Sequence, residues 1–214
     1  NGTRAYQDHD NAVPNATAGV FLNKTRTDMY ELTPFEETIF MDLDYIVMND
    51  SLSKVWGSAA PVRINHSITS LRPHHAANDE FVHPLGIPLY WSTVMYFRKS
   101  PEAEAMFQGI RHIKNNPVLF SMLYRFSENL FRNDMAVSIM AHCMNGGVGP
   151  DHSQAVVQAL PEPTLLFAWD DQPLLQVDQD RAWFVGNAWG EDKERAVAYV
   201  KEQSVHIVNK NSVL

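Results

Sequence analysis

Residues 33–48 read Thr-Pro-Phe-Glu-Glu-Thr-Ile-Phe-Met-Asp-Leu-Asp-Tyr-Ile-Val-Met, two short apolar runs separated by Asp42-Leu43-Asp44. Short continuous apolar runs are typical of buried strands, and strand ends in open α/β sheets face the ligand crevice. Side chains alternate along a strand, so we expect Asp42 and Asp44 to point to the same face. Two carboxylates placed in this way can hold one hard divalent ion, which in turn can bind a diphosphate.

The alternative is that Asp42 and Asp44 only begin a surface turn, because Asp-x-Asp is a common tripeptide. The apolar residues on both sides favour the metal site, since carboxylates at the end of a buried strand are costly unless a cation or water compensates them. The net charge of −8 argues against a nucleic-acid-binding surface. An acidic protein that handles an anionic substrate needs local positive charge or a metal.

The composition is that of an ordinary globular protein, with 45% apolar and 20% charged residues. A length of 214 residues suits one sizeable core, so residues 1–214 are expected to form a single domain. The one cysteine, Cys143, excludes a disulfide framework and is expected to be buried in an apolar run. No run approaches 18 apolar residues, so no membrane span is expected, and the expected location is cytoplasmic.

Apolar periodicity and breaker residues predict where the helices and strands lie. Residues 1–22 are expected to be loop or poorly ordered. Residues 60–83 have no clear period, and a loop lining a substrate cleft is favoured there over a histidine metal site. Helices are predicted over 25–32, 51–56, 101–110, 117–130, 134–144 and 189–203. Besides the two runs beside Asp42, strands are predicted over 86–97, 164–169, 182–185 and 205–208. The alternation predicts an α/β fold, a mainly parallel open sheet flanked by helices.

The segment from Thr25 to Val47 resembles the metal-dependent nucleotide-sugar glycosyltransferases of the GT-A fold, in particular the glycogenin-like (family 8-type) enzymes. In that family a basic residue precedes the first aspartate of the Asp-x-Asp motif by sixteen positions, and Arg26 stands there. The family phrase Phe-Met-Asp-x-Asp-x-(Ile/Leu)-Val is close to residues 40–47. The resemblance extends over roughly residues 23–210 and implies a GT-A-like fold.

Three further segments follow in the order of the family. Residues 90–94 correspond to an acceptor-side strand, in which Trp91 and Thr93 replace the family's Asn and Gly. Asn133-Asp134-Met135 corresponds to an Asp-Gln pair that faces the sugar, with the Asp kept and the Gln lost. His206-Ile-Val-Asn-Lys210 resembles a shortened His-x-x-Gly-x-x-Lys motif.

The resemblance implies a hexosyltransferase that moves a sugar from a nucleoside diphosphate, with UDP favoured, to an unknown acceptor. It implies Mn²⁺ (or Mg²⁺) on three ligands, Asp42, Asp44 and His206. The diphosphate would also contact Arg26 and Lys210, whose charges suit phosphate oxygens. Asp134 is the implied catalytic residue, which holds donor-sugar hydroxyls or assists charge at the anomeric centre.

Two alternatives remain open at this point. The replacements at Trp91 and Thr93 are compatible with a catalytically inactive module that binds a sugar nucleotide or a glycan. A nucleotidyltransferase also uses carboxylates and a divalent metal on an α/β sheet, although its Gly-rich, Lys-bearing opening loop is absent here. Only 41 residues precede Asp42, whereas family members place a longer nucleotide-binding region there, so we expect that an N-terminal segment is missing.

Overall fold

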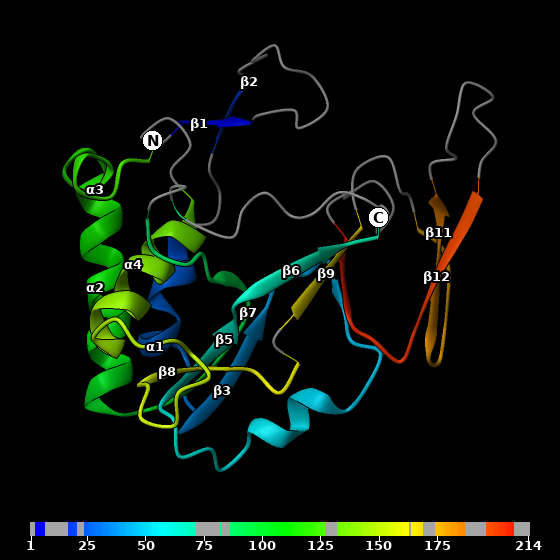
Figure 1. Cartoon of the computed structure of the whole chain (residues 1–214), viewed down its shortest axis with the longest axis horizontal. Helices are drawn as coiled ribbons and strands as arrows, with labels where there is room; N and C mark the ends of the chain where they lie inside the picture. The colour runs from blue at the N-terminus through cyan, green and yellow to red at the C-terminus, as the bar shows by residue number, and fades with distance from the viewer. Residues whose placement is uncertain are drawn as a thin grey trace.

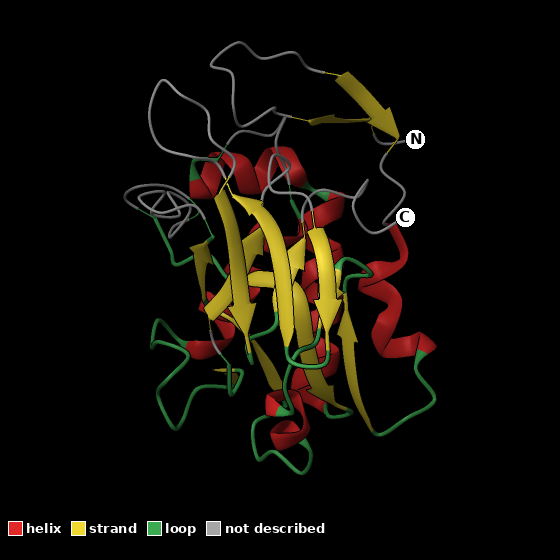
Figure 2. Cartoon of the chain, turned by 90° about the vertical axis from the view of Figure 1, so that its right-hand side faces the viewer, coloured by secondary structure: helices red, strands yellow, loops and turns green. Residues whose placement is uncertain are grey.

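The computed structural model describes residues 3–6, 17–20, 24–71, 82, 86–126, 132–162, 164–168, 174–186 and 196–207. These residues form an α/β structure in which the α-helices lie together to the left of the larger sheets (Figure 1). Figure 2, viewed from the side of β11 and β12, places the strands in front of the helices. None of the helices in this part of the chain has the length and apolar character that crossing a membrane requires.

The first sheet has the strand order β3-β7-β5-β8. Its strands are β3 (Glu37–Met41), β5 (Val62–Asn65), β7 (Trp91–Arg98) and β8 (Val157–Ala159). Strand β7 lies between two antiparallel neighbours, and its first seven residues are all buried. Both of its faces are therefore covered, which is why its sequence shows a continuous run without polar alternation.

Helices cover this sheet and complete its core. They are α1 (Met29–Leu32), α2 (Pro101–Asn115), α3 (Pro117–Tyr124) and α4 (Asn133–Asn145). Ser100 caps α2 as predicted, because its side chain accepts a hydrogen bond from the Ala103 amide at 3.1 Å. The rings of Phe97 on β7 and Phe107 on α2 meet edge to face, with 4.9 Å between their centroids.

Two further sheets contain most of the remaining described strands. One sheet has the order β4-β13-β9-β6, formed by β4 (Tyr45–Ile46), β6 (Ser67–Ser70), β9 (Thr164–Ala168) and β13 (Val205–Ile207). The other has the order β10-β11-β12, formed by β10 (Leu174–Asp178), β11 (Arg181–Gly186) and β12 (Ala196–Lys201). A second core joins the two sheets through residues such as Leu166, Phe184 and Ile207.

The prediction of a mainly parallel sheet is wrong. Six of the nine pairings among the described strands are antiparallel, and the three parallel pairings occur only in the two four-stranded sheets, which are mixed. An apolar run identifies a buried strand but carries no information on its direction, and the alternation with helices suggested parallel crossovers that mostly do not occur.

Four local predictions also differ from the structure. The helix predicted over 189–203 is wrong in its described part, because β12 pairs with β11 there and alternates exposed Val197 and Tyr199 with buried Val200. Residues 60–83 contain β5 and β6 rather than only loop. Within the predicted N-terminal loop, β1 (Thr3–Tyr6) pairs with β2 (Thr17–Val20). Cys143 is exposed, because α4 turns its other face to the core.

Candidate functional site

The two aspartates lie in the turn that leads from the first sheet into the second. A 3-10 helix, η1 (Lys24–Asp28), and a second one, η2 (Ser51–Val55), flank this part of the chain. The Asp42 amide donates to the Thr93 carbonyl of β7 at 2.9 Å, and the Ile207 amide of β13 donates to the Asp44 carbonyl at 2.8 Å. Backbone hydrogen bonds to both sheets therefore fix the turn at both ends.

Three predicted metal ligands meet at this turn. His206 Nε2 lies 3.1 Å from Asp44 Oδ1 and 4.0 Å from Asp42 Oδ2, although His206 is 162 positions from Asp44 in the chain. One ligand atom from each of the three residues lies within 4.8 Å of the other two. The side chains are 28% exposed at Asp42, 17% at Asp44 and 12% at His206. Leu43, between the aspartates, is fully exposed. Both carboxylates do lie on the side of His206, but they do so from a turn between β3 and β4 and not through the strand alternation expected from the sequence.

The donor set fits a divalent cation. Carboxylate oxygens suit Mg²⁺ and Mn²⁺, and one imidazole favours Mn²⁺ over Mg²⁺. The three side chains come from two elements whose backbones are already hydrogen-bonded, so their convergence does not require a rearrangement of the strands. The arrangement is therefore suited to a cation with a further anionic ligand.

Arg26 closes one side of the cluster. Its Nη1 donates to Asp42 Oδ1 at 2.7 Å, and its Nη2 donates to the Ser92 carbonyl. The guanidinium carbon lies 5.4 Å from the centroid of the Phe40 ring, and the side chain is only 11% exposed. Arg26, predicted to bind phosphate, is thus held beside the predicted metal ligands by a carboxylate, a carbonyl and a ring.

Asp42 is incompletely compensated by its surroundings. Burial raises the pKa of its carboxyl group, and the charges of Arg26 and His206, which act in the opposite direction, do not offset that effect. The neighbouring carboxylates of Asp44 and Asp134 raise the pKa further. Additional positive charge at this position would therefore stabilise the ionised form of Asp42.

Asp134 is in the opposite situation. Its Oδ1 accepts hydrogen bonds from the Ser92 amide at 2.8 Å and the Ser92 hydroxyl at 2.7 Å. Its Oδ2 accepts from Arg132 Nη2 at 2.8 Å and Nε at 3.1 Å. Burial alone would raise the pKa of Asp134, but Arg132, both Ser92 donors and Arg26 outweigh it and lower the pKa to about 2. Asp134 therefore stays ionised near neutral pH, and a carboxylate with so low a pKa is too weak a base to serve as a general base.

Arg132 and Ser92 are site residues that sequence reasoning missed. The Arg132 guanidinium lies 4.8 Å from the centroid of the Trp91 ring, and Trp91 is buried beneath it. Ser92 connects the two arginines, since its carbonyl accepts from Arg26 while its amide and hydroxyl donate to Asp134. The only signals for this pair were a hydroxyl residue within an aromatic strand and an arginine at the start of a helix.

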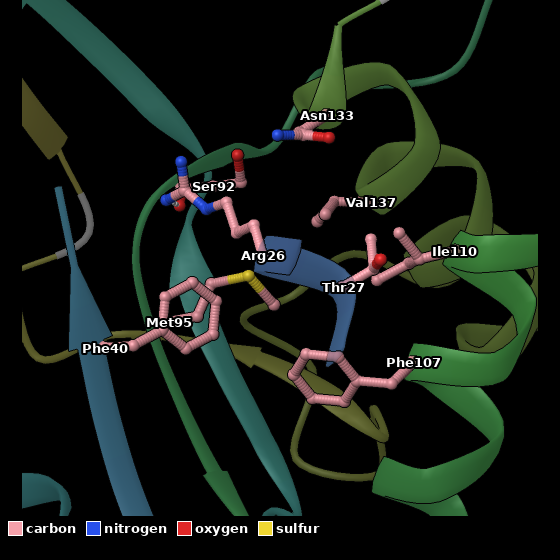
Figure 3. Close-up of a pocket in the computed structure, with 9 residues that line it drawn as sticks. All are labelled: Arg26, Thr27, Phe40, Ser92, Met95, Phe107, Ile110, Asn133 and Val137. Carbon is pink, nitrogen blue, oxygen red and sulfur yellow. Dashed lines mark hydrogen bonds between the residues drawn. The ribbon is translucent and has the colours of Figure 1, made fainter. Parts of the chain in front are cut away.

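A small cavity lies behind Arg26 (Figure 3). Its volume is about 10 Å³, close to that of one water molecule. Thr27, Ser92 and Asn133 contribute its polar wall, and Phe40, Met95, Phe107, Ile110 and Val137 contribute its apolar wall. Asn133 Oδ1 is buried without a hydrogen-bond partner among the described residues. The Arg26 side chain therefore borders incompletely filled space.

Some predicted residues are not placed at the site. Lys210 lies outside the described residues, as do His74, His75 and His83 of the segment weighed as a cleft loop. His66, from the same segment, lies 3.7 Å from the carboxylate of exposed Asp151. Comparisons of the chain with protein-family models, curated proteins and solved structures give no match. The functional assignment therefore rests on the geometry of the site and on its residue types.

Proposed function

We propose that this chain is a metal-dependent glycosyltransferase of GT-A-like fold that transfers a sugar from a nucleoside diphosphate, most simply UDP, to an acceptor. The observation that supports it is the convergence of Asp42, Asp44 and His206 beside Arg26. This cluster offers hard oxygen ligands, one imidazole and a guanidinium together, a combination suited to a cation with a bound diphosphate.

Each residue has a distinct role in this proposal. Asp42, Asp44 and His206 hold the Mn²⁺ or Mg²⁺, which would neutralise charge on the departing diphosphate. Arg26 donates to phosphate oxygens, and Lys210 is assigned the same role from the sequence alone. Asp134 acts by orientation: it fixes the Arg132 guanidinium, so that this group can meet sugar hydroxyls.

A second candidate is a module that binds a nucleotide sugar without transferring it. The observation that favours it is the engagement of Asp134 by Arg132 and Ser92, which leaves this carboxylate with a structural role. Trp91, which replaces the family's Asn, is buried beneath Arg132 and supports the guanidinium. Both candidates require the same cation cluster and differ in turnover.

Calorimetric titration of UDP tests the shared part of both candidates. We expect UDP to bind with Mn²⁺ present and to lose that binding in EDTA. Absence of UDP binding under both conditions would contradict the proposed function. Where UDP binds, incubation with a panel of UDP-hexoses distinguishes the two candidates, because only a transferase releases UDP by hydrolysis or transfer. Incubation with UTP and a hexose 1-phosphate tests the nucleotidyltransferase alternative separately, because that class of enzyme releases pyrophosphate from the triphosphate.

A further inference from the structure

Arg26 is hydrogen-bonded to the carboxylate of Asp42, which a cation bound by the cluster would need as a ligand. Asp42 Oδ1 accepts the 2.7 Å hydrogen bond from Arg26 Nη1, while Oδ2 faces His206 Nε2 at 4.0 Å. Both groups are largely buried, so water screens their interaction weakly. A cation held by the cluster would lie next to a guanidinium of like charge and would compete with it for Asp42. Arg26 should therefore oppose cation binding when no anion is present.

The surroundings of Arg26 allow its guanidinium to break the hydrogen bond with Asp42 while it keeps its contacts with the Ser92 carbonyl and the Phe40 ring. Nη2 donates to the Ser92 carbonyl and the guanidinium lies against Phe40, contacts that do not depend on Asp42. Figure 3 shows the arginine beside Ser92, at the wall of the small cavity that Asn133 and Val137 line from α4. Core side chains are normally close-packed, so free volume at this position gives the arginine stem room to shift.

We propose that Arg26 couples cation binding to diphosphate binding. In the ligand-free protein it is hydrogen-bonded to Asp42. When a cation takes over Asp42, the guanidinium is released to donate to a phosphate oxygen. The inference rests on the proposed function, because it requires a diphosphate beside the cation. The charge of the arginine should weaken binding of the cation alone, and a diphosphate that accepts from the released guanidinium should strengthen it. Because coupling between two ligands is reciprocal, the cation should strengthen UDP binding by the same factor.

The test measures Mn²⁺ affinity by calorimetry, with and without UDP, in wild type and Arg26→Met. Methionine keeps an apolar stem against Phe40 and the cavity but removes the charge and both donors. We expect Arg26→Met to bind Mn²⁺ alone about tenfold more tightly, and UDP to enhance its Mn²⁺ affinity about tenfold less than in wild type, within the usual range of linked sites. Arg181→Ala, which removes an arginine paired with Asp180 on β11, is the charge-matched control and should match wild type.

The outcomes separate the two ideas. Mn²⁺ binding by Arg26→Met that is equal to or weaker than wild type, with wild-type UDP binding intact, overturns the coupling and leaves the proposed function standing. If wild-type protein binds neither Mn²⁺ nor UDP, the coupling and the proposed function are both contradicted. Should Arg26→Met fail to fold by circular dichroism, Arg26→Lys replaces it. The single ammonium of lysine cannot bridge Asp42 and Ser92 as the guanidinium does. Arg26→Lys should therefore show a smaller increase in Mn²⁺ affinity than is expected of Arg26→Met. No increase would count against the coupling.

Discussion

Asp42 and Asp134 are two largely buried carboxylates that the protein links through Arg26 and Ser92, and it compensates their charges to different extents. Asp134 receives hydrogen bonds on both oxygens and has its pKa lowered to about 2. The pKa of Asp42, which accepts a hydrogen bond from Arg26 at 2.7 Å and lies 4.0 Å from His206, is raised. A carboxylate whose charge the protein compensates fully, such as Asp134, is suited to a structural role. A carboxylate whose charge is only partly compensated, such as Asp42, can gain the missing positive charge from a ligand. The difference separates a fixed half of the site, around Asp134, from a half open to ligands, around Asp42.

The largest expected effect is a difference in stability between Asp134→Asn and Asp42→Asn, the same substitution made in each half of the site. Asp134→Asn should lower the free energy of unfolding by about 3 kcal/mol, because an amide NH₂ would face donors that now meet two oxygens. This figure is at the lower end for broken buried pairs, since the Arg132 side chain is 25% exposed. Asp42→Asn should change it by less than about 1 kcal/mol, because one oxygen can still accept from Arg26. Urea denaturation measures the free energy of unfolding of both variants. Equal losses in the two would contradict the division of the site into a fixed half and a half open to ligands.

Asp44→Asn should act on ligand binding and not on stability. Loss of a charged metal ligand should weaken Mn²⁺-dependent UDP binding by about a hundredfold or more, above the usual effect of changes around metal ligands. The urea midpoint should stay near that of wild type. Asp50→Asn is the control, since Asp50 is exposed, lies in the same stretch of chain and caps nothing with its side chain. Wild-type affinity in Asp44→Asn would show that the cluster is not the cation site.

These contrasts also show what the sequence could predict. The strand predicted over 86–97 is present only from Trp91, as β7 (Trp91–Arg98), whereas the helix begun by Ser100 and Pro101 follows from local rules that tertiary structure did not override. The three predicted ligands do lie together, and whether they bind a metal stays a prediction. The engagement of Asp134 was not predictable, because Ser92 and Arg132 are 42 and two positions away and come from different elements. The direction of each strand, and whether residues 196–201 form a helix or a strand, likewise depend on pairing partners elsewhere in the chain.

The pH dependence of stability should reveal the fixed half directly. The pKa of Asp134 is about 2 in the folded protein against an ordinary 3.8. A lowered pKa in the folded state stabilises the protein above the unfolded value, so its contribution should be complete above about pH 4 and disappear as the pH falls from 3.8 towards 2. The stability difference between wild type and Asp134→Asn should shrink by about 2 kcal/mol over that interval. A difference that stays constant with pH would mean that the charge of Asp134 contributes nothing.

The smallest expected effect tests whether Ser92 belongs to the fixed half. Ser92→Ala removes the hydroxyl that donates to Asp134 at 2.7 Å but keeps the amide that donates to the same oxygen at 2.8 Å and the carbonyl that accepts from Arg26. Because one of two donors remains, the free energy of unfolding should fall by about 1 kcal/mol. Affinity for UDP with Mn²⁺ should stay within about twofold, since neither the cation cluster nor Arg26 loses a contact. If UDP binding were unchanged but affinity for a UDP-hexose fell at least about tenfold, the Ser92 hydroxyl would instead contact the sugar, and the boundary between the halves would run between Ser92 and Arg132.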